Sequence, residues 1–140
     1  MVKKLPVLLL LVLVLFYCCN KGKIRPACSP QVCTDVFTSI GIHFVDKQGQ
    51  PISVQNFQAI NLRTHSTIGP TLAGYGTLVI GYYIIADDGD LMKLSTAGDD
   101  IQVSGTDPAT NQTKTVVIKI AGGCTCHVSK ISGVDQIMFD

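Results

Sequence analysis

The chain has 140 residues, 46% of them apolar, and 11 Lys and Arg residues stand against 10 Asp with no Glu. This length allows one domain, and the near balance of charge excludes the basic surface that nucleic-acid binding requires. Neither a Gly-x-Ser-x-Gly nor a His-Glu-x-x-His sequence occurs, so neither a serine hydrolase nor a zinc protease is predicted.

Residues 1–18 have the pattern of a secretory signal peptide. Two lysines precede an uncharged run over residues 5–16, and this run is shorter than the roughly 20 residues that a transmembrane helix needs. It closes on two cysteines, and a cysteine at this place resembles the lipobox of bacterial lipoproteins, in which the thiol receives diacylglycerol and becomes the new N-terminus. Cleavage of the signal peptide favours a small residue directly before the cut. Lipidation of Cys19 would place small Cys18 there, whereas lipidation of Cys18 would place bulky Tyr17 there. Cys19 is therefore favoured, and Cys18 is the alternative. An uncleaved anchor and an ordinary signal peptide remain open.

If Cys18 leaves with the signal peptide, the cysteines that remain are Cys28, Cys33, Cys124 and Cys126. Their even number in an exported protein predicts two disulfides. Cys124 and Cys126 flank one residue in an expected strand, where side chains two residues apart run parallel and do not converge. We therefore expect each of them to pair with a cysteine of the N-terminal segment, in either order. A zinc site that adds His127 is the alternative.

The rest of the chain shows strand signals and no helical periodicity over three turns. The segment 77–86 is apolar on both faces, which predicts a central strand. Turn signals between the segments predict an all-β, antiparallel sandwich of the immunoglobulin-like or transthyretin-like kind, with about seven to eight strands. The expected strands are 37–46, 54–62, 77–86, 91–95, 101–104, 114–121, 124–131 and 135–139. The expected units are a signal peptide at 1–18, a lipidated tether at 19–33 and a sandwich domain at 34–140.

Two stretches carry a family resemblance. The pattern strand-Asp46-x-x-Gly49-x-Pro51 resembles the opening hairpin of carboxypeptidase-regulatory-like and transthyretin-like domains, which implies a β-sandwich. The ending at 124–133 is similar to the tail of small lipoproteins from Bacteroidetes, which implies a compartment and no activity. Surface-exported lipoproteins of those bacteria often carry acidic residues after the lipid cysteine. The sequence here is Asn-Lys-Gly-Lys at 20–23, which implies an outer-membrane protein that faces the periplasm.

The candidate chemical groups are few. Asp87, Asp88 and Asp90 could contribute to a calcium site, but they lack the spacing of a calcium-binding loop and are better explained as turn formers. The three histidines are His43, His65 and His127, and their spacing makes no ligand set. We therefore expect no cofactor and no catalytic residue.

These observations favour a membrane-attached envelope protein that is not an enzyme and that binds or assembles with a protein partner. The loops at 64–76 and 107–112 are the expected contact surfaces. One alternative is a small metal-handling or thiol-dependent protein that uses Cys124, Cys126 and His127, and it requires free thiols. A purely structural envelope lipoprotein is the other alternative.

Overall fold

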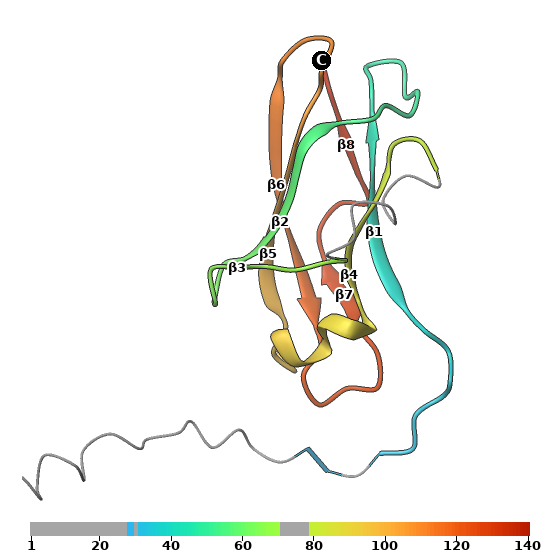
Figure 1. The fold of residues 1–140 in the computed structure, drawn as a ribbon, viewed down its shortest axis with the longest axis vertical. Helices are drawn as coiled ribbons and strands as arrows, with labels where there is room; N and C mark the ends of the chain where they lie inside the picture. The colour runs from blue at the N-terminus through green and yellow to red at the C-terminus, as the bar shows by residue number, and fades with distance from the viewer. Residues whose placement is uncertain (1–27, 30, 71–78) are drawn as a thin grey trace, which may run out of the picture.

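The computed structural model describes residues 28–29, 31–70 and 79–140, and in these residues the chain forms eight strands and one short 3-10 helix (Figure 1). The predicted all-β sandwich is therefore confirmed. The helix is η2 (Asp88–Lys93). The strands are β1 (Ser39–Val45), β2 (Gln55–Asn61), β3 (Ser66–Thr67), β4 (Tyr82–Asp87), β5 (Asp99–Thr106), β6 (Thr113–Ala121), β7 (Ser129–Ser132) and β8 (Gln136–Met138).

Two sheets face each other, as Figure 1 shows. The larger sheet has the order β3-β2-β5-β6-β7 and is antiparallel throughout. The smaller sheet has the order β4-β1-β8, in which β1 and β4 are antiparallel but β1 and β8 are parallel. His43 of β1 lies opposite Gln136 of β8, and Val45 lies opposite Met138. The fold thus departs from the predicted antiparallel pattern where the last strand returns beside the first.

The core lies between the sheets because alternate side chains of each strand point inward. Phe44 is fully buried and packs edge-on against Tyr83, with ring centroids 5.3 Å apart, and stacks on Phe139 at 6.1 Å. Gly105 of β5 faces this ring, and a Cβ atom there would lie 2.8 Å from Phe44 Cε1, so only glycine leaves room for it. The other large side chains with no exposed surface are apolar, apart from the amide of Asn61: Ile42, Ile85, Ile101, Val103, Ile118 and Ile120.

The prediction of a central strand at 77–86 is wrong. Residues 77 and 78 lie outside the described residues, Val79 and Ile80 are exposed in a turn, and β4 begins only at Tyr82. The backbone changes direction at Gly81, where φ is +76° and a Cβ atom would come within 2.7 Å of the Phe44 carbonyl oxygen. β4 is an edge strand, and β1 occupies the centre of its sheet. The apolar segment that the sequence presents as one central strand is therefore a turn followed by a half-buried edge strand.

The segment 91–95 is also not a strand as predicted, because η2 covers its first part. The carboxylate of Asp87 accepts a hydrogen bond from the Gly89 N–H, and the carboxylate of Asp90 accepts one from the Asp87 N–H, which makes a reciprocal cap at the helix start. Asp90 is buried and also accepts from Lys93 Nζ at 2.7 Å. The aspartates that the sequence places in a turn thus start a helix.

Further boundaries differ from the prediction, among them those of β5, which extends two residues beyond the expected 101–104 at each end. Of the expected strand at 124–131, only the part from Ser129 on is a strand, and 123–127 forms a turn followed by bends. Part of the loop expected at 64–76 is the short edge strand β3, while 71–76 lies outside the described residues.

The sandwich has two ends with different contents (Figure 1). One end, which we call the base, holds η2, the β6–β7 connection and the N-terminal segment from residue 28 to β1. The opposite end, which we call the distal end, holds the β1–β2 connection, the β5–β6 turn at 107–112 and the C-terminus. The Gln112 amide and the Asp140 backbone and carboxylate bond to each other there.

Candidate functional site

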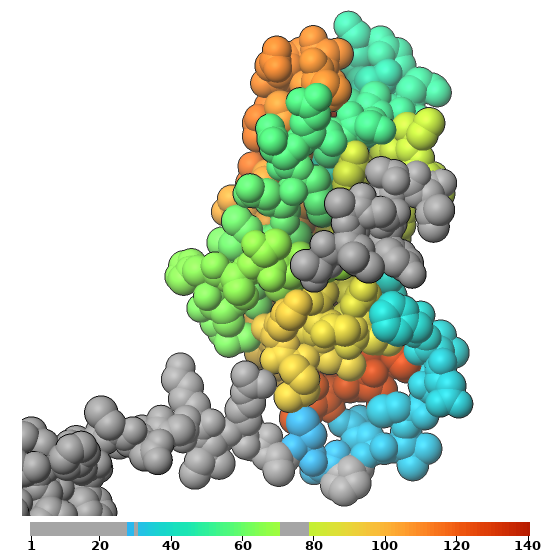
Figure 2. Space-filling model, in the orientation of Figure 1, coloured from blue at the N-terminus to red at the C-terminus, as the bar shows by residue number. Residues whose placement is uncertain are grey.

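The base of the sandwich carries the cysteines. Cys28 bonds to Cys124 and Cys33 to Cys126, with Cα atoms 5.2 Å and 5.3 Å apart. The crosswise prediction is confirmed, and the structure selects one of the two orders that the sequence left open. We call the described residues among 28–38 the strap, because these two bonds attach them to the base. Figure 2 shows these residues, in blue, at the base beside η2, in yellow.

The connection between β6 and β7 positions the second cysteine of each pair. Gly122 N–H donates to the Ser95 carbonyl and Gly123 N–H donates to the Leu91 carbonyl, so the connection is bound to the region of η2. Gly123 has φ +67°, which favours glycine. The Cys124 N–H donates to the Thr96 hydroxyl at 3.2 Å. The cysteines therefore lie in a turn and each faces the strap.

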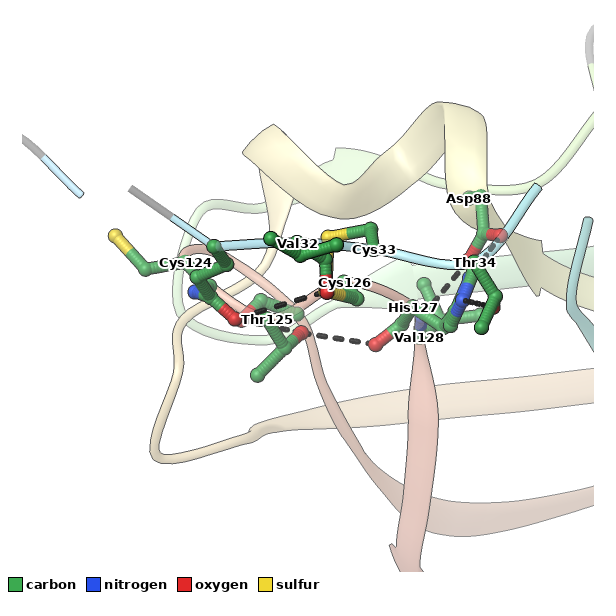
Figure 3. Close-up of a disulfide and its surroundings, with 11 residues drawn as sticks. Val32, Cys33, Thr34, Asp88, Cys124, Thr125, Cys126, His127 and Val128 are labelled. Atoms are coloured by element: carbon green, nitrogen blue, oxygen red, sulfur yellow. Dashed lines mark hydrogen bonds and ion pairs between the residues drawn. A yellow bond between two sulfur atoms is a disulfide. The ribbon is translucent and has the colours of Figure 1, made fainter. Parts of the chain in front are cut away.

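Asp88 is the polar centre of the base (Figure 3). One carboxylate oxygen accepts from the Thr38 N–H at 2.8 Å and lies 2.8 Å from His127 Nδ1, and the other accepts from the Val128 N–H at 2.9 Å. Burial raises the pKa of Asp88, but the hydrogen bonds from Thr38, His127 and Val128 and the charge of His127 outweigh it, so the pKa lies below its ordinary value. One carboxylate thus joins η2, the strap and the start of β7.

His127 extends this cluster to the strap. Its Nε2 atom lies 2.9 Å from the hydroxyl oxygen of Thr34, and its Nδ1 atom faces Asp88 (Figure 3). The order hydroxyl, imidazole, carboxylate is the order in a catalytic triad. The carboxylate also binds two backbone N–H groups, and Thr34 is an exposed residue next to a disulfide-bonded cysteine, so the same contacts join the strap to the base. The arrangement fixes the strap against the base, and we call Thr34, His127 and Asp88 the clamp.

The candidate calcium residues do not converge. Asp87 caps η2, Asp88 belongs to the clamp, and Asp90 accepts from the Gly69 N–H and Lys93. Within residues 28–29, 31–70 and 79–140, no group of three or more His, Cys, Asp or Glu side chains is placed to hold a metal ion. Of the three histidines, only His127 lies beside the cysteines that the sequence singled out. The alternative of a zinc site requires the four cysteines as free thiolates, but all four are joined in disulfides.

A second polar cluster lies near the base at the start of β5. Asp99 is buried and accepts two hydrogen bonds from the Arg63 guanidinium, at 2.7 Å each, together with bonds from Asn61 and Ser95. The guanidinium lowers the pKa of Asp99 well below its usual range against the opposing effect of burial, and the bonds from Ser95 and Asn61 lower it further. This cluster joins the end of β2 to the segment that follows η2, so it supports the base.

The sequence did not predict the clamp. Asp88 begins η2, and His127 lies 39 residues away in the β6–β7 connection. Thr34 is the first residue of the expected sandwich domain and precedes its first expected strand. The one available signal was the C-x-C-His sequence at 124–127, which placed His127 next to the cysteines without naming its partners. Cys18 and Cys19 lie outside the described residues.

Comparison of the chain with protein-family models, with curated proteins and with solved structures finds no match. In the part of the chain that the structure describes, no helix has the length and apolar character needed to cross a membrane.

Proposed function

We propose that this chain is a lipid-anchored protein of the bacterial cell envelope, whose sandwich is a non-catalytic module that binds or assembles with a protein partner. The observation that carries the proposal is the pair of disulfides from the strap to the base. They attach the segment that follows the expected lipid cysteine to one end of a folded domain. An anchor built in this way connects the lipid to the base of the domain and leaves the opposite end free of the tether.

The distal end supplies the proposed contact surface. Asp107 accepts hydrogen bonds from the Ala109 N–H at 2.9 Å and from the Thr110 hydroxyl at 2.7 Å, so the β5–β6 turn is fixed in one shape. Lys114 forms an ion pair with Asp140 beside this turn at 3.0 Å. A contact surface whose backbone is already ordered loses little conformational entropy when it binds. The loop at 107–112, which the sequence favoured, is therefore our proposed partner site.

The lipid cysteine in this proposal is Cys19, with Cys18 as the alternative, and the location is the periplasmic side of the outer membrane because residues 20–23 contain no acidic side chain. The thiol-dependent and metal-handling alternative needs Cys124 and Cys126 as free thiols, and the disulfides occupy both. The purely structural alternative differs from the proposal only in having no partner.

The anchor is tested by mass spectrometry of the mature N-terminus in the wild type and in Cys19→Ala and Cys18→Ala. We expect a diacylated Cys19 in the wild type and in a Cys18→Ala variant, and no lipid in Cys19→Ala. A mature chain that starts elsewhere without lipid would contradict the anchor.

The partner site is tested by capture from detergent-solubilised envelope with the tagged full chain. The variant Ala109→Arg places a long charged side chain at the distal turn, and Gln58→Arg is the matched control because Gln58 is an exposed residue of β2. We expect a protein captured by the wild type and by Gln58→Arg to be lost with Ala109→Arg. Recovery of the chain alone from every mild detergent would favour the purely structural alternative.

A further inference from the structure

The strap exposes large apolar side chains at the base. Val32 has a relative exposure of 103%, Phe37 of 69% and Val36 of 66%. Met92, on η2 at the same end of the molecule, is 60% exposed. The strap runs over the outside of the base beside η2, as Figure 2 shows. Two disulfides and the clamp hold it there, so these apolar groups are presented at a fixed place. Exposed apolar groups gathered at one end of a domain mark an interaction surface.

The covalent structure limits how far this surface can lie from a lipid, an argument that rests on the proposed anchor at Cys19. Cys28 follows Cys19 by nine residues, and nine fully extended residues span at most about 30 Å. The disulfide of Cys28 fixes that end of the tether to the base. Val32 precedes the second fixed residue, Cys33. The apolar groups of the strap therefore belong to the part of the domain nearest to the lipid.

The charges that precede the strap in the sequence indicate what covers it. Lys21, Lys23 and Arg25 lie between Cys19 and Cys28, where the sequence has no acidic residue. Basic residues next to an anchor are attracted to anionic lipid headgroups. Asp35 is the one acidic residue of the strap and is exposed, and an ionised carboxylate favours the headgroup region over the hydrocarbon core. Apolar side chains of proteins that lie on a membrane enter about 5–10 Å into this region.

We infer that the base of the sandwich is a membrane-contact surface, on which Val32, Val36 and Phe37 enter the headgroup region of the bilayer next to the lipid anchor. This contact orients the domain. The lipid alone would hold the domain near the membrane, whereas the apolar strap turns the base toward the lipid and the loop at 107–112 away from it.

The chain contains no tryptophan, so one introduced tryptophan reports on a single position. The variants are Phe37→Trp and Val32→Trp at the strap, with Ala109→Trp at the distal turn as the matched control, because all three residues are exposed. Each full-length lipoprotein is reconstituted into vesicles of anionic phospholipids that carry brominated acyl chains, which quench tryptophan fluorescence at short range. We expect severalfold stronger quenching and blue-shifted emission for both strap variants, and unquenched emission for Ala109→Trp.

The outcomes separate this inference from the proposed function. Mass spectrometry of the same samples determines whether the lipid is attached. With the lipid present, equal quenching at all three positions or at none would overturn the membrane-contact surface and leave the anchor intact. With the lipid absent, the proposed anchor fails, but quenching of the strap variants alone on added vesicles would still support the contact surface.

Discussion

Asp88 holds three segments with one carboxylate, and its charge is what makes this possible. Its oxygens accept from the Thr38 and Val128 N–H groups and face the His127 ring. An ionised carboxylate has only acceptor sites, and it can satisfy all three donors together. Protonation converts one oxygen into a donor and removes the charge that the imidazole faces. The clamp therefore depends on the protonation of one side chain.

We expect the clamp to open in acid. The pKa of Asp88 is lowered in the folded protein, so its contribution is present above the unfolded value of about 3.9 and is lost as the pH falls through the lower, folded value. Amide hydrogen exchange checks this: the protection of Thr38 and Val128 should fall below about pH 4 while that of β5 persists. In an Asp88→Asn variant the two amides should lose protection on the order of tenfold at neutral pH, since a hydrogen bond to a charged group is worth about 1.5 kcal/mol. Protection that stays constant down to pH 2 would show that the backbone, and not the carboxylate, holds the strap.

Asp99 is the residue whose neutralisation should cost the most stability. It is almost fully buried and binds the Arg63, Asn61 and Ser95 side chains. Asp99→Asn keeps the size of the side chain but removes the charge, and we expect a loss of about 2–3 kcal/mol in the free energy of unfolding. Urea denaturation with the disulfides intact measures it. The matched control is Asp100→Asn on the exposed face of the same strand, with an expected change within about 0.5 kcal/mol. Equal effects of the two substitutions would contradict the assigned role of Asp99.

The lowered pKa of Asp99 adds a pH dependence to this prediction. Its stabilising effect is present above the unfolded value of about 3.9 and declines as the pH falls toward its lower, folded value. The difference between the wild type and Asp99→Asn should therefore narrow in acid.

The two disulfides act as one element because they are interlaced. Each alone closes a loop, of sequence separation 96 or 93, which is worth about 4.7 kcal/mol in the chain-entropy account. Once one is formed, the other closes a ring of only about seven residues, five on the strap and two on the β6–β7 connection, worth about 2.4 kcal/mol. Their contributions are therefore strongly coupled.

We expect the double variants Cys28→Ser with Cys124→Ser, and Cys33→Ser with Cys126→Ser, to lose about 2–3 kcal/mol each in the free energy of unfolding. Replacement of all four cysteines should cost about 7 kcal/mol, more than the sum of the two losses. Urea denaturation of the three proteins measures the coupling. Additive losses would mean that the strap contributes through its contacts and not through closure of the chain.

At the scale of elements, the sequence predicts strands well where one face is buried. Buried and outward side chains alternate along β5 and β6. This period of two predicts that both segments are strands and which side chains of each point into the core. Prediction failed where local capping or a turn overrode hydrophobicity. Asp87 and Asp90 cap a helix that extends from an expected turn into the expected strand at 91–95, and Gly81 turns the chain inside an apolar run. The crosswise direction of the disulfides could be predicted because the C-x-C spacing restricts it, although their order could not. The clamp depends on contacts between η2, the β6–β7 connection and the strap, which are distant in the sequence and leave no local pattern.

At the scale of the whole molecule, one of the two disulfides and the parallel strand pair of the smaller sheet have the same sequence separation. Cys33 and Cys126 are 93 residues apart in the sequence, and so are His43 and Gln136, which face each other in the parallel pair of β1 and β8. Ten residues of each segment therefore separate the disulfide from this pair, and in the second segment they include β7, which belongs to the larger sheet. In the oxidised chain, pairing of β1 with β8 closes a loop of about 20 residues, ten from each segment, in place of a loop of 93 residues. The shorter loop lowers the free-energy cost of loop closure by about 1.4 kcal/mol.

The oxidised protein should therefore form the β1–β8 pair early in folding, on the order of ten times faster than a chain without disulfides, since 1.4 kcal/mol corresponds to tenfold. Ile137 of β8 is buried against the core, and Ile137→Val should cost about 1 kcal/mol of stability. If the pair forms before the transition state, most of this loss lies in the folding rate, with a φ value above about 0.5. Stopped-flow refolding and unfolding of the oxidised wild type and of Ile137→Val measure this ratio without any variant that lacks the disulfides. A substitution that speeds unfolding and leaves refolding unchanged would mean that β8 joins the sheet last, and that the disulfides stabilise the folded state without guiding the chain toward it.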